Sequence, residues 1–359
     1  MFKIKSLTVE DTTFYKGIAI LMILFHNFFH WVKPSPGENE IVFDNQIVIN
    51  YINIIKSDYF EFFQATFSFL GHYGVQVFIF LSAYGLTKKY ISKNINYLDF
   101  IKKRISKVYF PFIFAIIIWF LYLSLFSFTW GNSLGPIEII SKNLTSLIYK
   151  ITLISNFVPD EVYSINGPWW FISLIIQFYF VFPFLLKISQ HEKGNTFLLM
   201  IAGMSIFISM LLNGKLPFFI YGTFIGHLPE FILGIYLAKK ENFSISLVSF
   251  IGVLIIFILG NIYTPLWYFT DISITLILIL ILQNLKKITT GTVLKFINYI
   301  GGISMFIFLL NGFLRKPFIN IANEIGLWYA TITISLVFFL FVIFISHFSD
   351  KIYNKIIGK

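Results

Sequence analysis

Ten stretches of largely apolar residues recur along this chain, and all but one of them are 17 to 21 residues long. A helix needs about 20 such residues to cross the roughly 30 Å hydrocarbon core of a bilayer. We therefore predict an all-α, polytopic transmembrane helical bundle of about ten spans, formed by residues 1–359 as one integral-membrane domain with no appended soluble domain. The predicted spans are 15–31, 71–87, 108–128, 168–186, 196–212, 226–238, 245–262, 266–285, 296–314 and 327–347.

The overall composition excludes an ordinary soluble enzyme. Hydrophobic residues make up 57% of the 359 residues and charged residues only 12%, against about a quarter in soluble domains. The chain has no cysteine, which excludes disulfides, thiolate nucleophiles, cysteine-based zinc sites and iron–sulfur clusters. A further apolar segment, 144–157, contains Lys150, and we predict that it is re-entrant or interfacial.

The distribution of Lys and Arg predicts the orientation, because cytoplasmic loops retain these residues. With the N-terminus inside, the inner segments carry 20 of the 27 Lys and Arg, and both termini are cytoplasmic. Only Arg315 and Lys316 clearly oppose the rule, since they form a basic pair in a predicted outer loop. The two longest loops, 32–70 and 129–167, also lie outside. The net charge of +10 then divides into about +14 inside and about −4 outside, and it gives no reason to expect nucleic acid as a partner.

Polar residues at membrane depth are costly and mark functional sites. In the first span Lys16 lies at the inner end, and His26 follows ten residues later, about 15 Å along the axis. A buried histidine that faces a cavity suits a general base, although a histidine that only bonds a neighbouring helix has the same spacing. His30, one turn further, leaves a metal pair as another interpretation, but no acid accompanies the two on this helix, and we predict no metal site.

Two segments after the first span carry further candidates. The helix that opens with Gly71-His72-Tyr73-Gly74 contains Ser82, whose hydroxyl lies among small residues that allow close packing. The inner loop 88–107 carries seven positive charges and a single acid. Such a loop attracts anionic lipid headgroups, and it also suits the phosphates of a nucleotide or coenzyme A. Within it we single out Arg104 and Lys107, which lie three residues apart at a predicted helix start.

Taken in order, these segments resemble the acyltransferase 3 family of polytopic membrane acyltransferases. The match includes the first helix, GVQVFIFLSAYGL at 74–86 and the basic loop. Residues 170–183, WFISLIIQFYFVFP, are similar to the family pattern W-S-L-S-V-E-E-Q-F-Y-x-x-F-P. Residues 301–311, GGISMFIFLLN, resemble G-K-I-S-Y-x-x-Y-L-x-H. The resemblance spans nearly the whole chain and implies ten spans with both termini inside.

For function, the resemblance implies transfer of an acyl group, usually acetyl from acetyl-CoA, to a hydroxyl of a cell-surface polysaccharide or lipid-linked glycan. His26 matches the essential histidine of the family, Lys16 its basic partner, and the Lys103, Arg104 and Lys107 cluster the motif that engages the donor. No metal is implied. We expect a multi-pass protein of the plasma or inner membrane, in contact with membrane lipid, and consider a homodimer or a complex with a polysaccharide synthase. Candidates for substrate binding are Trp170, Ser173, Gln177, Glu230 and Asn311.

The chain departs from the family pattern at three places. Its spacing is Lys-x9-His instead of Arg-x10-His, which turns Lys16 about 80° away from the face of His26. Ile175 and Ile176 replace an acidic pair, and Asn311 replaces a late histidine. A mechanism that needs those carboxylates would require another acid, such as Glu230.

Three functions stay open at this level. The first is an O-acyltransferase in which His26 is the general base and Lys16 or Ser82 steadies the oxyanion or the donor. An acyl-enzyme through Ser82 or Ser173 is a variant of it, although no nucleophile–base spacing supports one. The second is an exporter of lipid-linked or polymeric sugar, against which the chain shows no inverted repeat. The third is a structural partner in a polysaccharide synthase complex.

Overall fold

Helices build almost the whole structure, a computed structural model that describes residues 1–129 and 135–358. Residues 130–134 of the second predicted outer loop lie outside this range. The α-helices are α1 (Val9–Phe29), α2 (Gln46–Ser57), α3 (Phe62–Leu70), α4 (Gly74–Tyr90), α5 (Tyr97–Thr129), α6 (Pro136–Ile151), α7 (Trp170–Ser189), α8 (Gly194–Leu212), α9 (Leu228–Ala238), α10 (Leu247–Gly260), α11 (Thr264–Trp267), α12 (Thr270–Ile288), α13 (Gly291–Gly302), α14 (Ser304–Leu314), α15 (Lys316–Ile325) and α16 (Trp328–Ile356). Short 3-10 turns are η1 (Tyr59–Glu61), η2 (Gly71–Tyr73), η3 (Ser155–Phe157), η4 (Gly167–Trp169) and η5 (Ile220–Gly222).

The prediction of an all-α membrane bundle is confirmed. Among the described residues, six helical stretches are long and apolar enough to cross a membrane. They are Val9–Phe29, Tyr59–Tyr90, Tyr97–Leu125, Gly167–Ser189, Gly194–Leu212 and Trp328–Ile356. The bent pair α13 and α14 makes a seventh. The other predicted spans lie on α9 and α10, which are shorter, and on α12, which carries charged residues at both ends.

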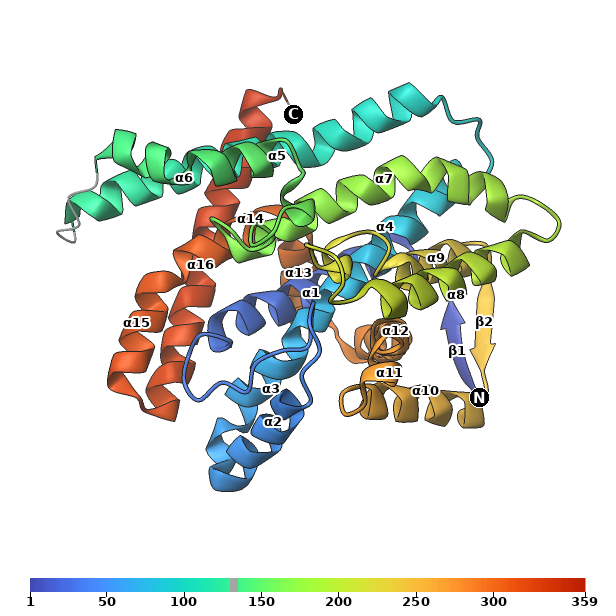
Figure 1. Cartoon of the computed structure of the whole chain (residues 1–359), viewed down its shortest axis with the longest axis horizontal. Helices are drawn as coiled ribbons and strands as arrows, with labels where there is room; N and C mark the ends of the chain where they lie inside the picture. Colours follow the sequence, from blue (N-terminus) through green and yellow to red (C-terminus); the bar gives the residue numbers. More distant parts are fainter. Residues whose placement is uncertain (130–134, 359) are drawn as a thin grey trace.

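The predicted span 296–314 lies on two helices, because α13 and α14 meet at an angle of 75°. The bend follows Gly301, whose missing side chain lets α13 press against α1: a Cβ there would collide with the carbonyl oxygen of Thr13. Ile303 links the two helices outside regular α geometry. As a result α14 runs in a different direction from α13 while it still packs against α1. Figure 1 shows α13 and α14 near the middle of the molecule.

α1 occupies the centre, between α4, α13 and α14 (Figure 1). Its start is fixed by a capping box, in which Thr8 and Asp11 each satisfy the other's backbone N–H. The Lys286 amine donates to Asp11 Oδ1 at 2.6 Å and ties α12 to the same end. With 21 residues, α1 is about 31 Å long, which lets its two ends serve opposite sides of a bilayer.

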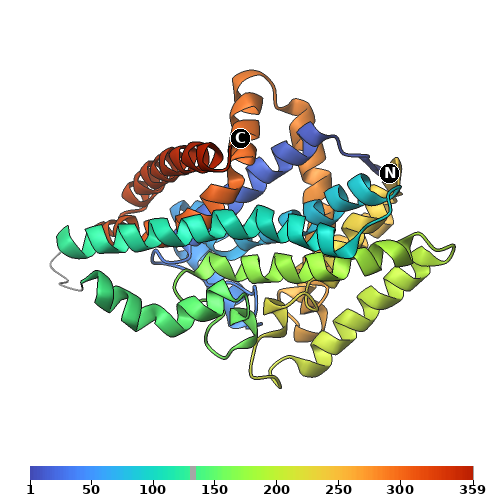
Figure 2. The same cartoon turned by 90° about the horizontal axis from the view of Figure 1, so that it is seen from above.

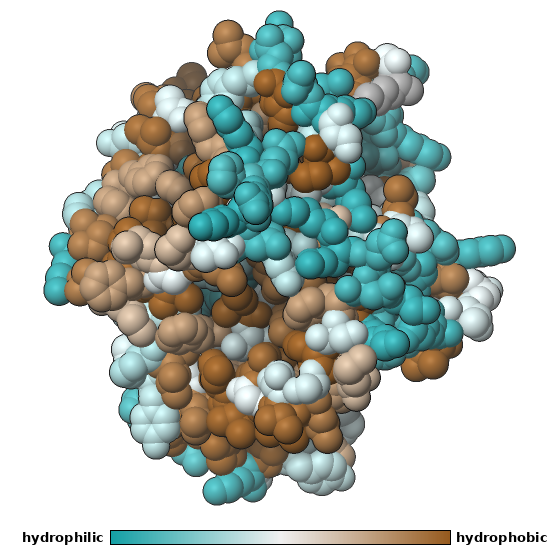
Figure 3. Space-filling model, turned by 90° about the vertical axis from the view of Figure 1, so that its right-hand side faces the viewer, coloured by the Kyte–Doolittle hydropathy of each residue, from teal (hydrophilic) through white to brown (hydrophobic). Residues whose placement is uncertain are grey.

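A two-stranded antiparallel sheet, β1 (Phe2–Lys5) and β2 (Asn242–Ile245), ties the N-terminus to the segment after α9. Phe2 pairs with Ile245 and Lys5 with Asn242. The sequence analysis did not anticipate these strands. The side of the molecule that holds them is seen in Figure 3, where hydrophilic side chains gather across the upper half and apolar ones cover much of the rest.

α6 lies beside α5, and α5 and α7 run together across the molecule (Figure 2). An apolar stripe of α6 is exposed, while its Lys150 is buried and donates to the carbonyl oxygens of Glu161 and Val162. An exposed apolar stripe on one face is typical of a helix that lies along a lipid interface, which matches the predicted character of segment 144–157. The stripe consists of Ile137, Ile140, Leu144, Ile148 and Ile151.

Candidate active site

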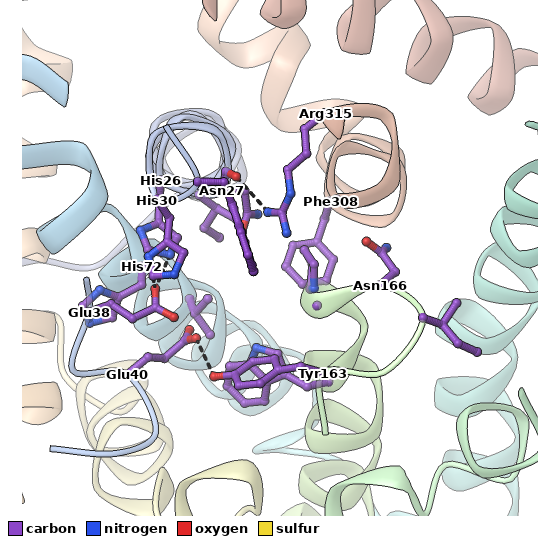
Figure 4. A pocket seen from close by; sticks show the side chains of 18 residues that line it. His26, Asn27, His30, Glu38, Glu40, His72, Tyr163, Asn166, Phe308 and Arg315 are labelled. Carbon is purple, nitrogen blue, oxygen red and sulfur yellow. Dashed lines mark hydrogen bonds and ion pairs between the residues drawn. The ribbon is translucent and has the colours of Figure 1, made fainter. Parts of the chain in front are cut away.

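A cavity of about 480 Å³ opens around His26, near the predicted outer end of α1. Its walls come from α1, the segment after it, η2, the segment before α7, and α14 (Figure 4). Helices α1, α4, α7 and α14, the turn η2 and the two irregular segments thus meet at one place. Its polar lining residues are His26, Asn27, His30, Glu38, Glu40, His72, Tyr163, Asn166 and Arg315.

His26 is held between a backbone acceptor and a carboxylate. Its Nδ1 lies 3.0 Å from the carbonyl oxygen of Ser68, so this nitrogen carries a proton. Its Nε2 lies 2.5 Å from Oε2 of Glu38. The carboxylate of Glu38 therefore lies directly against the imidazole of His26. The arrangement is a histidine–carboxylate dyad, with the imidazole orientation fixed from both sides.

Two further histidines surround the dyad. His30 Nδ1 lies 3.6 Å from the same Glu38 oxygen, and the His72 ring centroid lies 5.6 Å from that of His26. η2 reaches α1 this closely because residue 71 is glycine; a Cβ there would collide with the Cβ of His26. Both ring nitrogens of His72 are buried and have no hydrogen-bond partner among the described residues. The site is therefore built to accept further polar groups.

The two acids of the segment after α1 differ in charge state. Burial alone would raise the pKa of Glu38, but the nearby imidazoles of His26 and His30 outweigh it, and the pKa lies below its ordinary value. Burial and the negative charge of Glu38 raise the pKa of Glu40 well above its ordinary value. Tyr163 donates to Glu40 Oε2 at 3.4 Å. Glu38 is thus ionised at neutral pH, and the carboxyl of Glu40 is shifted toward its neutral form.

Two groups of side chains have the composition of a metal site. His26, Glu38 and His72 form one, and His227, Glu230 and Asp271 the other, each with ligand atoms within 4.8 Å of one another. Ligand atoms around a tetrahedral zinc ion are roughly 3.3 Å apart, from bonds of about 2.0–2.1 Å. The 2.5 Å between His26 Nε2 and Glu38 Oε2 is shorter than this separation, and it fits a direct contact between the two side chains better than two ligands of one zinc ion. We therefore treat this group as a proton-transfer dyad.

A second cavity, of about 700 Å³, lies toward the predicted inner side. It brings together Lys16, Ser82, Arg104 and Lys107, together with Lys89, which the sequence analysis did not single out. Arg104 stacks on the rings of Tyr90 and Phe100. Lys103 is exposed and lies outside the lining. Lys16 thus shares a cavity with the basic cluster and Ser82 and not with His26, as the off-face spacing suggested.

Phe308 of α14 separates the two cavities. Within the described part of the chain it is the only residue that lines both of them. Its ring is 6% exposed and packs edge-on against Phe171 of α7, with centroids 5.3 Å apart. Ser304 lines the inner cavity and Gly312 the outer one, each one helical turn away. The ring of Phe308 therefore borders both the basic inner cavity and the outer cavity that holds the histidine dyad.

Of the predicted substrate-binding residues, only Trp170 lines the outer cavity. Ser173 is buried and lines neither cavity. Gln177 accepts a hydrogen bond from the Phe224 N–H at 3.1 Å and so fixes the segment before α9. Asn311 is fully buried and accepts from the Asn27 amide at 2.8 Å. These two residues support the walls of the site.

Glu230 belongs to a separate, fully buried cluster. His227 Nδ1 lies 3.2 Å from Glu230 and 3.4 Å from Asp271, and its Nε2 donates to the carbonyl oxygen of Tyr221 at 2.9 Å. The three side chains face one another and line neither of the two cavities. Glu230 consequently does not replace the missing acidic pair of α7 in the dyad; Glu38 occupies the carboxylate position beside His26.

Sequence reasoning missed Glu38, Glu40 and Tyr163. Glu38 lies in the turn PSPGENE, eight residues beyond His30, and the signal available was an acid placed shortly after a membrane histidine in a proline- and glycine-rich turn. Nothing in spacing alone indicates that this turn folds back over the helix end. Arg315 was noted as an exception to the charge rule, and the structure places it in the outer cavity.

Residues 13–348 match the profile of a protein family described as an acyltransferase domain, the acyltransferase 3 family. No curated protein and no solved structure matches the chain.

Proposed function

The chain belongs to the acyltransferase 3 family and is a multi-pass membrane acyltransferase, and from this premise we propose that it moves an acetyl group from acetyl-CoA to a hydroxyl of a cell-surface polysaccharide or lipid-linked glycan. The observation that carries the proposal is the pair of cavities that meet at Phe308, one basic and one built around His26 and Glu38. Donor and acceptor enter from opposite sides and react at this junction.

The inner cavity suits the donor. Lys16, Lys89, Arg104 and Lys107 offer four cations to the phosphates of coenzyme A, and guanidinium and ammonium groups bind phosphate strongly. A volume of about 700 Å³ lies in the range of small-molecule sites and leaves room for the thioester arm. Because acyl-CoA is a cytoplasmic compound, this assignment makes the basic side cytoplasmic and the membrane the plasma or inner membrane.

The outer cavity supplies the base. The proton on Nδ1 of His26 is committed to the backbone, so Nε2 is the nitrogen that takes the proton of the acceptor hydroxyl. The hydroxyl oxygen attacks the thioester carbonyl, the new C–O bond forms, and the C–S bond breaks. Coenzyme A leaves as the thiolate and takes a proton from water on the donor side. Glu38, which lies against Nε2, stabilises the imidazolium and relays the proton from Nε2 to water in the outer cavity. The loss of this proton restores the base.

Acetyl analysis of the surface glycan tests the proposal. Cells that carry His26→Ala should lose acetylation, and cells that carry His191→Ala, a change at an exposed histidine in the turn between α7 and α8, should retain it. The amount of exported glycan should be the same in both. Normal acetylation with reduced export in the His26→Ala cells would refute the transferase proposal and favour an exporter.

A further inference from the structure

Arg315 is a basic residue at a position where the positive-inside rule disfavours one. It lies between α14 and α15, in a segment that the charge distribution places outside, where Lys and Arg are depleted. Its guanidinium lines the outer cavity that holds His26 (Figure 4). Burial lowers the pKa of Arg315 to about 10, which still leaves it charged at neutral pH. A positive charge that is largely removed from water in this cavity requires an anion to balance it.

No carboxylate in the described part of the outer cavity pairs directly with Arg315. Glu38 lies against His26 and His30, and the structure describes no carboxylate within 4.0 Å of the guanidinium. The charge of Glu38 acts on Arg315 from a distance and raises the pKa of the guanidinium, against the larger effect of burial. Arg315 therefore has no directly bonded anion among the described residues. Partly buried cations without a partner are costly, which points to an anion that arrives with a ligand.

The side chain of Arg315 is also held ready for such a ligand. Its Nη1 donates to the carbonyl oxygen of Asn27 at 2.8 Å, and the guanidinium lies over the ring of Trp31 at 5.4 Å. The other guanidinium nitrogens have no hydrogen-bond partner among the described residues. This anchor holds the remaining N–H groups in the cavity that His26 also lines. Fixed N–H groups on a planar guanidinium bind carboxylate and phosphate in a defined orientation.

We propose that Arg315 binds an anionic group of the acceptor, the carboxylate of an acidic sugar or a phosphate on the glycan, and thereby turns the reacting hydroxyl toward His26. This inference rests on the proposed function and narrows it to acidic glycans. Arg315 is a binding and positioning residue here; it takes no part in the proton transfer.

The test uses the surface glycan from cells that lack this protein, as acceptor for the purified enzyme with labelled acetyl-CoA. One portion is untreated, one has its carboxyl groups reduced to alcohols, and one has its phosphates removed by hydrogen fluoride. We expect one of the two treatments to raise the KM of the wild-type enzyme for the glycan by roughly tenfold or more, and to identify which anion binds. Equal KM values for all three portions would overturn the inference.

Variants provide an independent arm. Arg315→Gln should raise the glycan KM by the same factor on the untreated portion, leave the KM for acetyl-CoA unchanged, and lose the sensitivity to treatment. Lys316→Gln, which removes the adjacent exposed outer charge, is the matched control and should behave as wild type. An Arg315→Gln enzyme that still distinguishes the portions would contradict the assignment. Absence of any labelling of untreated glycan by the wild-type enzyme would refute the proposed function itself, which is a different outcome.

Discussion

Replacing Glu38 by glutamine removes the negative charge beside His26 while it keeps the size of the side chain. In the structure Glu38 Oε2 lies 2.5 Å from His26 Nε2, in a largely buried position. A hydrogen bond to a charged group contributes about 1.5–3 kcal/mol, and 1.4 kcal/mol corresponds to a factor of ten, so kcat should fall by roughly 10- to 150-fold. The loss arises because the imidazolium that forms in the reaction has lost its anion.

The assay measures acetyl transfer by purified protein as a function of both substrates and of pH. Glu38→Gln should lower kcat and leave the KM for acetyl-CoA unchanged, because Glu38 is not part of the inner cavity. The pKa of Glu38 lies below its ordinary value, so its carboxylate stays charged across the neutral range. Titration of Glu38 itself should therefore contribute nothing to the pH dependence of wild-type kcat between about pH 6 and pH 8. An unchanged kcat would refute the dyad.

Glu40→Gln is the matched comparison, because it makes the same change two residues further along the same segment. The raised pKa of Glu40 shifts this carboxyl toward its neutral form, which glutamine imitates. We expect a change in kcat of less than about threefold. Equal large losses for the two variants would show that the segment, and not the charge on His26, is being disturbed.

Three further outcomes follow from the structure. Neutralising Arg104 and Lys107 together should weaken acetyl-CoA binding to purified protein by tenfold or more, roughly the contribution of one charged hydrogen bond. Lys102→Gln, at an exposed position of the same helix, should leave the binding unchanged. Unchanged affinity in the double variant would mean that the basic loop only sets the topology. Phe308→Ala should join the two cavities and let the enzyme use acyl chains longer than acetyl. Phe306→Ala, which changes a buried phenylalanine that lines neither cavity, should not change the acyl-chain preference. Identical acyl-chain preferences in both variants would contradict the role of Phe308 as a partition between the cavities. Burial lowers the pKa of Lys150 from its ordinary 10.5 to about 8, so between these values the native protein releases a proton that the unfolded chain keeps, and the thermal stability should rise with pH there in wild type but not in Lys150→Met.

Much of the fold could be predicted from apolar length and charge, because these follow local rules. The ten apolar stretches all lie on helices, and segment 144–157 has the exposed stripe of an interfacial helix. What could not be predicted depends on contacts between distant segments. The bend before α14 comes from the approach of Gly301 to α1, and the sheet joins Phe2 to Ile245 across most of the chain.

The candidate site shows the same division. His26 could be singled out because a histidine at membrane depth is conspicuous by itself, and Lys16 and Arg104 because they lie in basic segments. Glu38 could not, since its role depends on a turn that folds back over the end of α1. Gln177 matched a family pattern, and Asn311 lies where that pattern has a histidine. The structure gives both residues supporting positions, which a pattern cannot distinguish from contact with substrate.

Transfer across a sealed vesicle tests the central claim most directly. The protein is reconstituted in one orientation, fixed by protease accessibility of the loop between α4 and α5, with labelled acetyl-CoA on one side and deacetylated glycan on the other. We predict labelled glycan only when acetyl-CoA is on the side of that basic loop and the glycan is on the side of His26. Labelling that requires both substrates on the same side would contradict the two-cavity account.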